Sequence, residues 1–401
     1  MKTACKSCLA SALALALAPL SATAQSSPWS FEWNLRARHE QVSDDAYARE
    51  ANAETLRLRA GLRFAGDGGW NGLLEAEGVA AGGAHDSGAN GKSGDPQVVD
   101  PAGVELNQAF VGWKNATFSA AVGRQRLSFD NQRWVGNSGW RQNEQTFDAL
   151  ALAFSPAPDV ALRYAFLDRV HRVNGDDALD PRARERALST HLFNAAWKRG
   201  KQQFAGYAYL HEDRDVPSAS SATWGLRWTG TRPLRAATFG WTLDAARQRD
   251  YAGNPLDFSH AYWLLEPALT VRGTTLRAGW EHLGGDGAHA LQAPLGTLHA
   301  FNGWADKFLS TPANGLDDRY LGLGRAFGRE RGGARAAWQL AWHDYRADAG
   351  GARYGREWDA SLSLPLAKGA SATLKYADYR ADALARDTRK LWLQLEYSGS
   401  R

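Results

Sequence analysis

Apolar and polar residues alternate with a period of two along most of the chain. From residue 29 to residue 38, Trp, Phe, Trp, Leu and Ala occupy every second position, with Ser, Glu, Asn and Arg between them. The same alternation returns at residues 55–64, 224–228, 338–342 and 391–397. Strict alternation is typical of a β-strand with one apolar and one polar face, whereas an amphipathic helix repeats every 3.6 residues. The sequence therefore predicts an all-β, antiparallel protein.

Short turns alternate with long polar loops between these segments. The eight turns and nine loops make seventeen connections, which predicts about eighteen strands. An even number of strands places both chain ends on the same side. The turns are expected at residues 66–69, 115–116, 156–159, 199–201, 230–235, 272–273, 328–333 and 365–369, and the loops at 43–52, 81–104, 130–142, 174–187, 213–218, 250–257, 284–317, 347–354 and 380–386.

The chemistry of the two faces indicates the architecture. The polar face is dense in Arg and Glu, and aromatic residues gather near the segment ends. A soluble sandwich would either bury the Arg side chains or leave the Trp side chains exposed to water. A barrel in lipid instead places the apolar face against hydrocarbon and the aromatic side chains at the interfaces. About eighteen strands enclose an aqueous lumen. We therefore expect a transmembrane barrel with short periplasmic turns and long extracellular loops, formed by residues 25–401 as a single domain.

Residues 1–24 have the features of a secretory signal peptide. Lys2 and Lys6 precede an apolar run at residues 9–20, and Ala22-Thr23-Ala24 is a small-residue cleavage site. This predicts export to the outer membrane of a Gram-negative bacterium, with outer-membrane lipid, lipopolysaccharide and the barrel insertion machinery as partners. The 47 basic and 43 acidic residues are scattered, and a formal charge of +4 without a basic cluster argues against a nucleic-acid partner.

Several short segments carry a family resemblance. They are residues 55–59 (TLRLR), 99–101 (VDP) with 105–109 (ELNQA), 123–125 (GRQ), and 130–136 (DNQRWVG) with 140–148 (WRQNEQTFD). On these segments the chain resembles the alginate export family of outer-membrane barrels, most sharply over residues 31–175. Outer-membrane barrels usually end on an aromatic residue that the insertion machinery reads, whereas this chain continues for four residues after Tyr397.

The resemblance implies an eighteen-stranded monomeric barrel whose Arg-rich lumen passes an anionic polysaccharide outward, with periplasmic export partners among its expected contacts. The alternative is a general or nutrient-uptake porin in which the arginines only bias the flow of anions. An outer-membrane hydrolase and a non-conducting adhesin are further alternatives. No nucleophile elbow or dinucleotide fingerprint is found in the sequence, so we expect neither catalysis nor a cofactor.

Basic residues on the polar face are the candidate substrate path. They are Arg36, Arg38, Arg57, Arg59, Arg63, Arg163, Arg227, Arg277, Arg335 and Lys390. Guanidinium groups keep their charge and pair with carboxylates in two-point contacts, which suits a uronic acid polymer. The competing interpretation is a structural ladder of ion pairs, because many acids share the same face. They are Glu32, Glu40, Glu75, Glu77, Asp244, Glu281, Glu357, Asp359 and Glu396.

Two loops contain further candidate residues. In the loop at residues 130–145, Arg133, Trp134, Trp140 and Arg141 would either form a lumen constriction or sugar contact, or pack together over the barrel rim. The loop at residues 284–317 carries two His and several Asp residues, including His299 and Asp306, without metal-ligand spacing. We expect these carboxylates to be solvated and expect no metal site.

Overall fold

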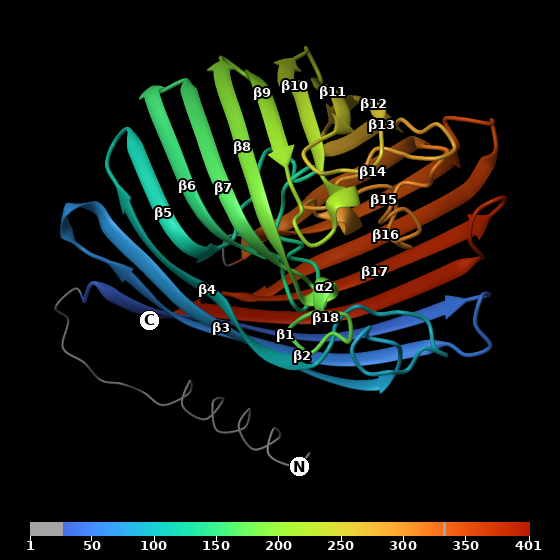
Figure 1. Ribbon diagram of the computed structural model, residues 1–401, viewed down its shortest axis with the longest axis horizontal. Coiled ribbons are helices and arrows are strands. Elements are labelled where there is room, and N and C mark those ends of the chain that lie inside the picture. The colour runs from blue at the N-terminus through green and yellow to red at the C-terminus, as the bar shows by residue number, and fades with distance from the viewer. Residues whose placement is uncertain (1–26, 332–333) are drawn as a thin grey trace.

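The computed structural model describes residues 27–331 and 334–401, and the predicted signal peptide lies outside these residues. The described chain forms one antiparallel sheet of 18 strands in which each strand pairs with its sequence neighbour and β1 pairs with β18. In Figure 1 the blue strand β1 lies beside the red strand β18. The predicted all-β closed barrel of about eighteen strands is confirmed.

The strands are long and their connections alternate in length. The strands are β1 (Trp29–Asp44), β2 (Ala51–Ala65), β3 (Trp70–Ala84), β4 (Gly103–Lys114), β5 (Phe118–Gln125), β6 (Thr146–Ala157), β7 (Val160–His171), β8 (Glu185–Arg199), β9 (Gln202–His211), β10 (Ser221–Pro233), β11 (Thr238–Asp250), β12 (Ser259–Val271), β13 (Thr274–Leu283), β14 (Leu316–Arg331), β15 (Ala334–Arg346), β16 (Arg353–Ala367), β17 (Ala370–Ala381) and β18 (Thr388–Ser400). The short helices are η1 (Asp67–Gly69), α2 (Pro181–Arg184), η2 (Pro217–Ala219) and η3 (Leu298–Ala300). Within the described ranges, no helix has the length and apolar character needed to cross a membrane.

The alternating residues separate onto the two faces of the barrel wall as predicted. Large apolar side chains such as Leu74 and Leu226 are exposed on the outer face, by 57% and 73%. The charged residues between them point inward, and Arg57 and Glu77 are each only 1% exposed. An apolar outer face on a closed barrel matches the hydrocarbon of a bilayer.

Aromatic residues form belts where the outer face nears the strand ends. Across strands β8 to β11, Trp197, Phe204, Trp228 and Trp241 follow one another, with ring centroids 5.4 to 5.7 Å apart. Trp280 on β13 and Trp358 on β16 are exposed near the other edge of the barrel, where the long loops join the strands. Amphipathic rings at both levels are the usual anchors of a barrel at the two membrane interfaces.

The interior also contains an apolar core, which the alternation did not predict. Loop residues such as Phe129, Leu291 and Phe308 are buried against the inward-facing side chains Leu192 and Tyr345. Part of the lumen is therefore packed rather than water-filled.

Leu291→Ala tests this interior core. The Leu291 side chain is fully buried, so its truncation should leave a cavity and lower the free energy of unfolding by about 2–5 kcal/mol. Denaturant unfolding in detergent or lipid, followed by tryptophan fluorescence, measures the change. The control is Leu179→Ala, at an exposed loop position, which should change stability by less than about 0.5 kcal/mol; equal effects would contradict a packed interior.

Candidate functional site

Two long loops fold into the lumen. We name residues 126–145, between β5 and β6, the first inserted loop, and residues 284–315, between β13 and β14, the second inserted loop. Arg36 on β1 donates from Nη1 to the carbonyl oxygens of Gly139 and Trp140, at 3.1 and 3.2 Å, and Arg38 also donates to Trp140. The first inserted loop is therefore held against the inner wall by charged donors.

Asp306 in the second inserted loop joins both loops to the wall. Its carboxylate accepts hydrogen bonds from His299 Nδ1 at 2.6 Å, from Arg141 of the first inserted loop at 2.9 Å and from Lys390 of β18 at 2.8 Å. Burial alone would raise the pKa of Asp306, but His299, Lys390 and Arg141 together hold it well below its usual range. The carboxylate is thus a charged hub between three elements.

Lys375 of β17 enters an aromatic enclosure beside this hub. Its Nζ lies 3.9 Å from the ring centroid of Trp304 and 4.2 Å from that of Trp140, and it donates to His299 Nε2 at 2.6 Å. Trp140 also stacks on His299 with an interplanar angle of 9°. Desolvated cation–π contacts of this kind are among the stronger ones.

The His299 imidazole is neutral in this arrangement. Burial lowers its pKa, Asp306 opposes the shift, and the Lys375 charge adds to it, so that the pKa of His299 falls to about 3. The ring therefore donates from Nδ1 to Asp306 and accepts at Nε2 from Lys375.

The first inserted loop has two further anchors. Arg133 pairs with Glu281 of β13 at 3.0 Å and donates to Asn302 at 3.0 Å. Trp134 donates from Nε1 to the Tyr207 hydroxyl at 3.1 Å and is buried against Tyr262. Trp134 thus occupies a packed position rather than an open lumen surface.

Half of the predicted basic path lies inside this packed network. Arg36, Arg38, Arg57, Arg59 and Lys390 point inward and are each less than 9% exposed. Arg38 pairs with Asp100 at 2.9 Å, and Arg59 pairs with Glu77 and Glu144. These groups bind the barrel's own loops and acids in the described structure.

The other predicted basic residues lie toward the short turns. Arg63 pairs with Glu32 at 2.5 Å and Arg227 with Asp244 at 2.9 Å, while Arg335 donates to the Gly328 carbonyl at 3.2 Å. Arg163, Arg277 and Arg335 are exposed, and within the described ranges none of the three makes an ion pair. The predicted basic residues therefore divide into buried groups that bind the barrel's own loops and acids, and more open groups, some of which have no ion pair in the described ranges.

Arg277 opens on a lumen cavity of about 540 Å³ below the inserted loops. Aromatic residues and Arg227 share its wall, as do several carboxylates. The lining includes Arg227, Arg277, Glu266, Glu281, Phe301, Trp304 and Tyr320. A cavity with cations, acids and ring faces suits a polar solute that carries both hydroxyl and carboxylate groups.

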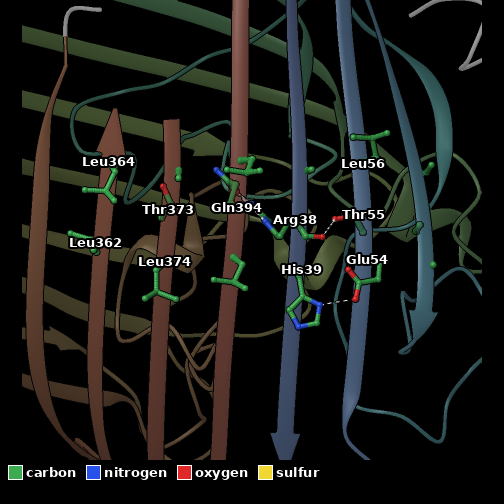
Figure 2. A pocket seen from close by; sticks show the side chains of 17 residues that line it. Arg38, His39, Glu54, Thr55, Leu56, Leu362, Leu364, Thr373, Leu374 and Gln394 are labelled. Atoms are coloured by element: carbon green, nitrogen blue, oxygen red, sulfur yellow. Dashed lines mark hydrogen bonds and ion pairs between the residues drawn. The ribbon is translucent and has the colours of Figure 1, made fainter. Parts of the chain in front are cut away.

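A larger hollow of about 680 Å³ lies on the outside of the wall, not in the lumen. We name it the outer groove, and Figure 2 shows its leucines on β2 and β16 to β18, with the His39–Glu54 pair toward one end. His39 Nδ1 and Glu54 are 2.7 Å apart. Because its side chains face the hydrocarbon, the outer groove is a surface for lipid rather than for a transported solute.

His282, Asp317 and Asp348 place potential metal-ligating atoms within 4.8 Å of one another at the loop end of the barrel. The two ring nitrogens of His282 already face the two carboxylates, at 3.0 and 4.0 Å. This arrangement is a carboxylate–imidazole–carboxylate chain, and a cation would have to replace one of its contacts.

Several residues of the network were not in the predicted set. Lys375, Trp304 and Arg126 were absent from it, although Lys375 follows the inward alternation of its strand. The expectation that the carboxylates at residues 284–317 are solvated is wrong for Asp306, which is buried by its three hydrogen-bonding partners. Arg126 follows the end of β5, in which Gly123 has a positive φ of 121°, and pairs with Glu75 at 2.7 Å.

The closed wall, its lipid-facing exterior and its charged lumen define an outer-membrane channel of the porin class. A family model described as alginate export matches residues 27–266, which is more than half of the chain. The chain belongs to the alginate export family, and its place is the outer membrane of a Gram-negative bacterium. No curated relative matches the sequence.

Solved porin structures share the fold at low sequence identity. Acinetobacter baumannii OccAB4 has a TM-score of 0.72 and 14% identity, covering 94% of this chain and 99% of its own. Acinetobacter baumannii OccAB2 has a TM-score of 0.73 and 13% identity, covering 93% and 98%. Pseudomonas aeruginosa OpdK with vanillate has a TM-score of 0.70 and 14% identity, covering 93% and 99%.

Asp306→Asn should loosen the inserted loops. The change leaves Lys390 and Arg141 buried without a carboxylate, which costs about 3–5 kcal/mol for a buried pair. We expect larger and more variable single-channel conductance in a planar bilayer. The exposed loop substitution Asp45→Asn is the control, and a conductance indistinguishable from the wild type would show that Asp306 does not hold the loops.

Acidification should destabilise the same network. The unfolded His299 takes up a proton near pH 6.5 while the folded ring resists it down to about pH 3, so stability is lost as pH falls through this window. By pH 4 the loss should reach about 3 kcal/mol. Denaturant unfolding at pH 7 and pH 4 measures it, with His299→Gln as the comparison; an equally steep pH dependence in that variant would contradict the assignment.

Proposed function

We propose that this protein is a passive channel for acidic saccharides of the polyuronate class. The observation that carries the proposal is the pair of exposed guanidinium groups, Arg163 and Arg277, on the inner face toward the short-turn end. Fixed positive charges lining a pore select anions, and a polyanion passes when each contact is weak. Membership of the alginate export family supports this substrate class.

The lumen cavity supports a saccharide rather than an inorganic anion. Trp304 and Phe301 supply ring faces, and Glu266 is an acceptor for hydroxyl groups, on a wall that also carries Arg277. The transported chain would contact these groups in turn without a covalent step. Flux through such a channel follows the gradient or a periplasmic partner, so the geometry is compatible with export.

A second candidate function is the uptake of small acidic solutes. The specific observation in its favour is the tight fixation of the two inserted loops by Asp306 and Arg133, which narrows the passage. The fold is also similar to that of OpdK, whose structure contains vanillate, a small aromatic acid. The two candidates differ in the length of the solute that enters.

The double variant Arg163→Gln/Arg277→Gln tests the anionic path. We expect anion-over-cation permeability in a planar bilayer to fall severalfold, and block by polyuronate to weaken about tenfold, because two weak charge contacts are lost. Arg325→Gln removes an exposed guanidinium from the outer face of β14 and is the matched control. Unchanged selectivity in the double variant would contradict the proposal, and block by monomeric uronate but not by the polymer would favour the second candidate.

A further inference from the structure

Five arginines lie on the outer face at the extracellular ends of β15 to β18. We name them the rim cluster: Arg346, Arg353, Arg356, Arg380 and Arg389. Arg389 lies between Thr388 and Lys390, which are buried inside, and Arg356 precedes Glu357, which is also buried inside. The Arg356 and Arg380 side chains are 53% and 57% exposed. The rim cluster therefore faces the lipid headgroups and not the lumen.

Nearby carboxylates offset much of the charge of the rim cluster, and two of its guanidiniums, Arg356 and Arg389, have no close acidic partner in the described part of the chain. Asp344 lies 3.0 Å from Arg346 and 3.9 Å from Arg356 and is in direct contact with Arg353, which also pairs with Asp382 at 3.3 Å. Arg380 pairs with Asp378 at 2.9 Å and with Asp387 at 3.1 Å. Arg356 therefore has only a long contact to a carboxylate that two other guanidiniums approach more closely. Arg389 makes no ion pair in the described part of the chain.

The strand register opposes like charges within this cluster. Arg356 lies directly opposite Arg380, and Arg346 directly opposite Arg353. Like charges facing each other across a strand pair are destabilising. Asp344 offsets the repulsion between Arg346 and Arg353, and Asp378 and Asp387 offset the charge of Arg380. Arg356 and Arg389 are the cations left open to an external anion, and guanidinium groups bind phosphate in two-point contacts.

The outer groove continues the rim cluster toward the membrane interior. Leu362 lies six residues from Arg356 on β16, and Leu374 six residues from Arg380 on β17. Six residues of strand span about 20 Å, which for a strand tilted by about 40° is roughly 15 Å of membrane depth, the thickness of one leaflet. Figure 2 shows Leu362, Leu364 and Leu374 together on this wall.

We propose that this face binds a phosphorylated glycolipid of the outer leaflet, a lipopolysaccharide. Its phosphates would contact Arg356 and Arg389, with Arg380 between them, and an acyl chain would fill the outer groove. The site lies outside the lumen and is independent of the transported solute. It assigns the lipopolysaccharide contact to a particular third of the barrel wall.

Native mass spectrometry of the detergent-solubilised full chain, titrated with bisphosphorylated lipid A, tests the site. Arg356→Gln/Arg389→Gln should weaken binding about tenfold or more, because two cations near an anionic headgroup are lost. Ala372→Trp, which fills the outer groove without touching the rim cluster, should weaken it severalfold. Arg325→Gln, at the opposite rim of the outer face, should leave the affinity within about twofold.

Heat-modifiable gel mobility shows whether each variant retains its barrel. Weaker binding of monophosphorylated lipid A and of phosphatidylglycerol would support recognition of the bisphosphorylated headgroup. Equal affinity of phosphatidylglycerol, or wild-type affinity in the double arginine variant, would overturn the proposal. Wild-type affinity in Ala372→Trp would overturn the acyl-chain assignment to the outer groove.

Discussion

The pairing of β1 with β18 is the constraint on which the structure depends. The two strands remain in register from Glu32 opposite Ser400 to Asp44 opposite Thr388, and Phe31 exchanges two backbone hydrogen bonds with Arg401. In hydrocarbon an unpaired edge strand is prohibitively costly, so the sheet must close. Closure then fixes which alternate residues meet lipid and which meet the interior, and the remaining chemistry follows from that separation.

Charges on the inner wall are used in two ways. Where the inserted loops fill the lumen, inward cations such as Arg36 and Lys390 satisfy loop carbonyls and carboxylates, because a buried charge without a partner is costly. Toward the short turns, Arg163 and Arg277 are exposed on the inner face of the wall. The same residue type therefore holds the inserted loops at one level of the barrel and is exposed to the lumen at another.

The sequence was sufficient to predict the barrel but not the packing inside it. The number of strands, their faces and the positions of loops follow from a two-residue period and from local turn residues, all of which are readable from short windows. The Asp306 hub joins residues 141, 299 and 390, and no local pattern records such separations. From the sequence alone, Asp306 cannot be distinguished from a solvated loop acid, because the partners that bury it are brought together only by the fold.

The sequence predicted which residues of the candidate site point into the barrel, but not which of them the inserted loops would cover. Alternation placed Arg57 and Arg277 on the same face, but it carried no information on which of them an inserted loop would cover. The resemblance of the segments around Arg133 and Trp140 correctly pointed to the family, yet Trp134 and Trp140 lie in packed positions whose partners come from distant strands.

The first inserted loop also has a mechanical consequence. It is bonded to β1 through Arg36, to β9 through Tyr207 and to β13 through Glu281, which are widely separated around the wall. Contacts that join distant strands across the bore oppose any deformation that moves those strands relative to one another. The loop that narrows the passage is thus also the brace that preserves its shape.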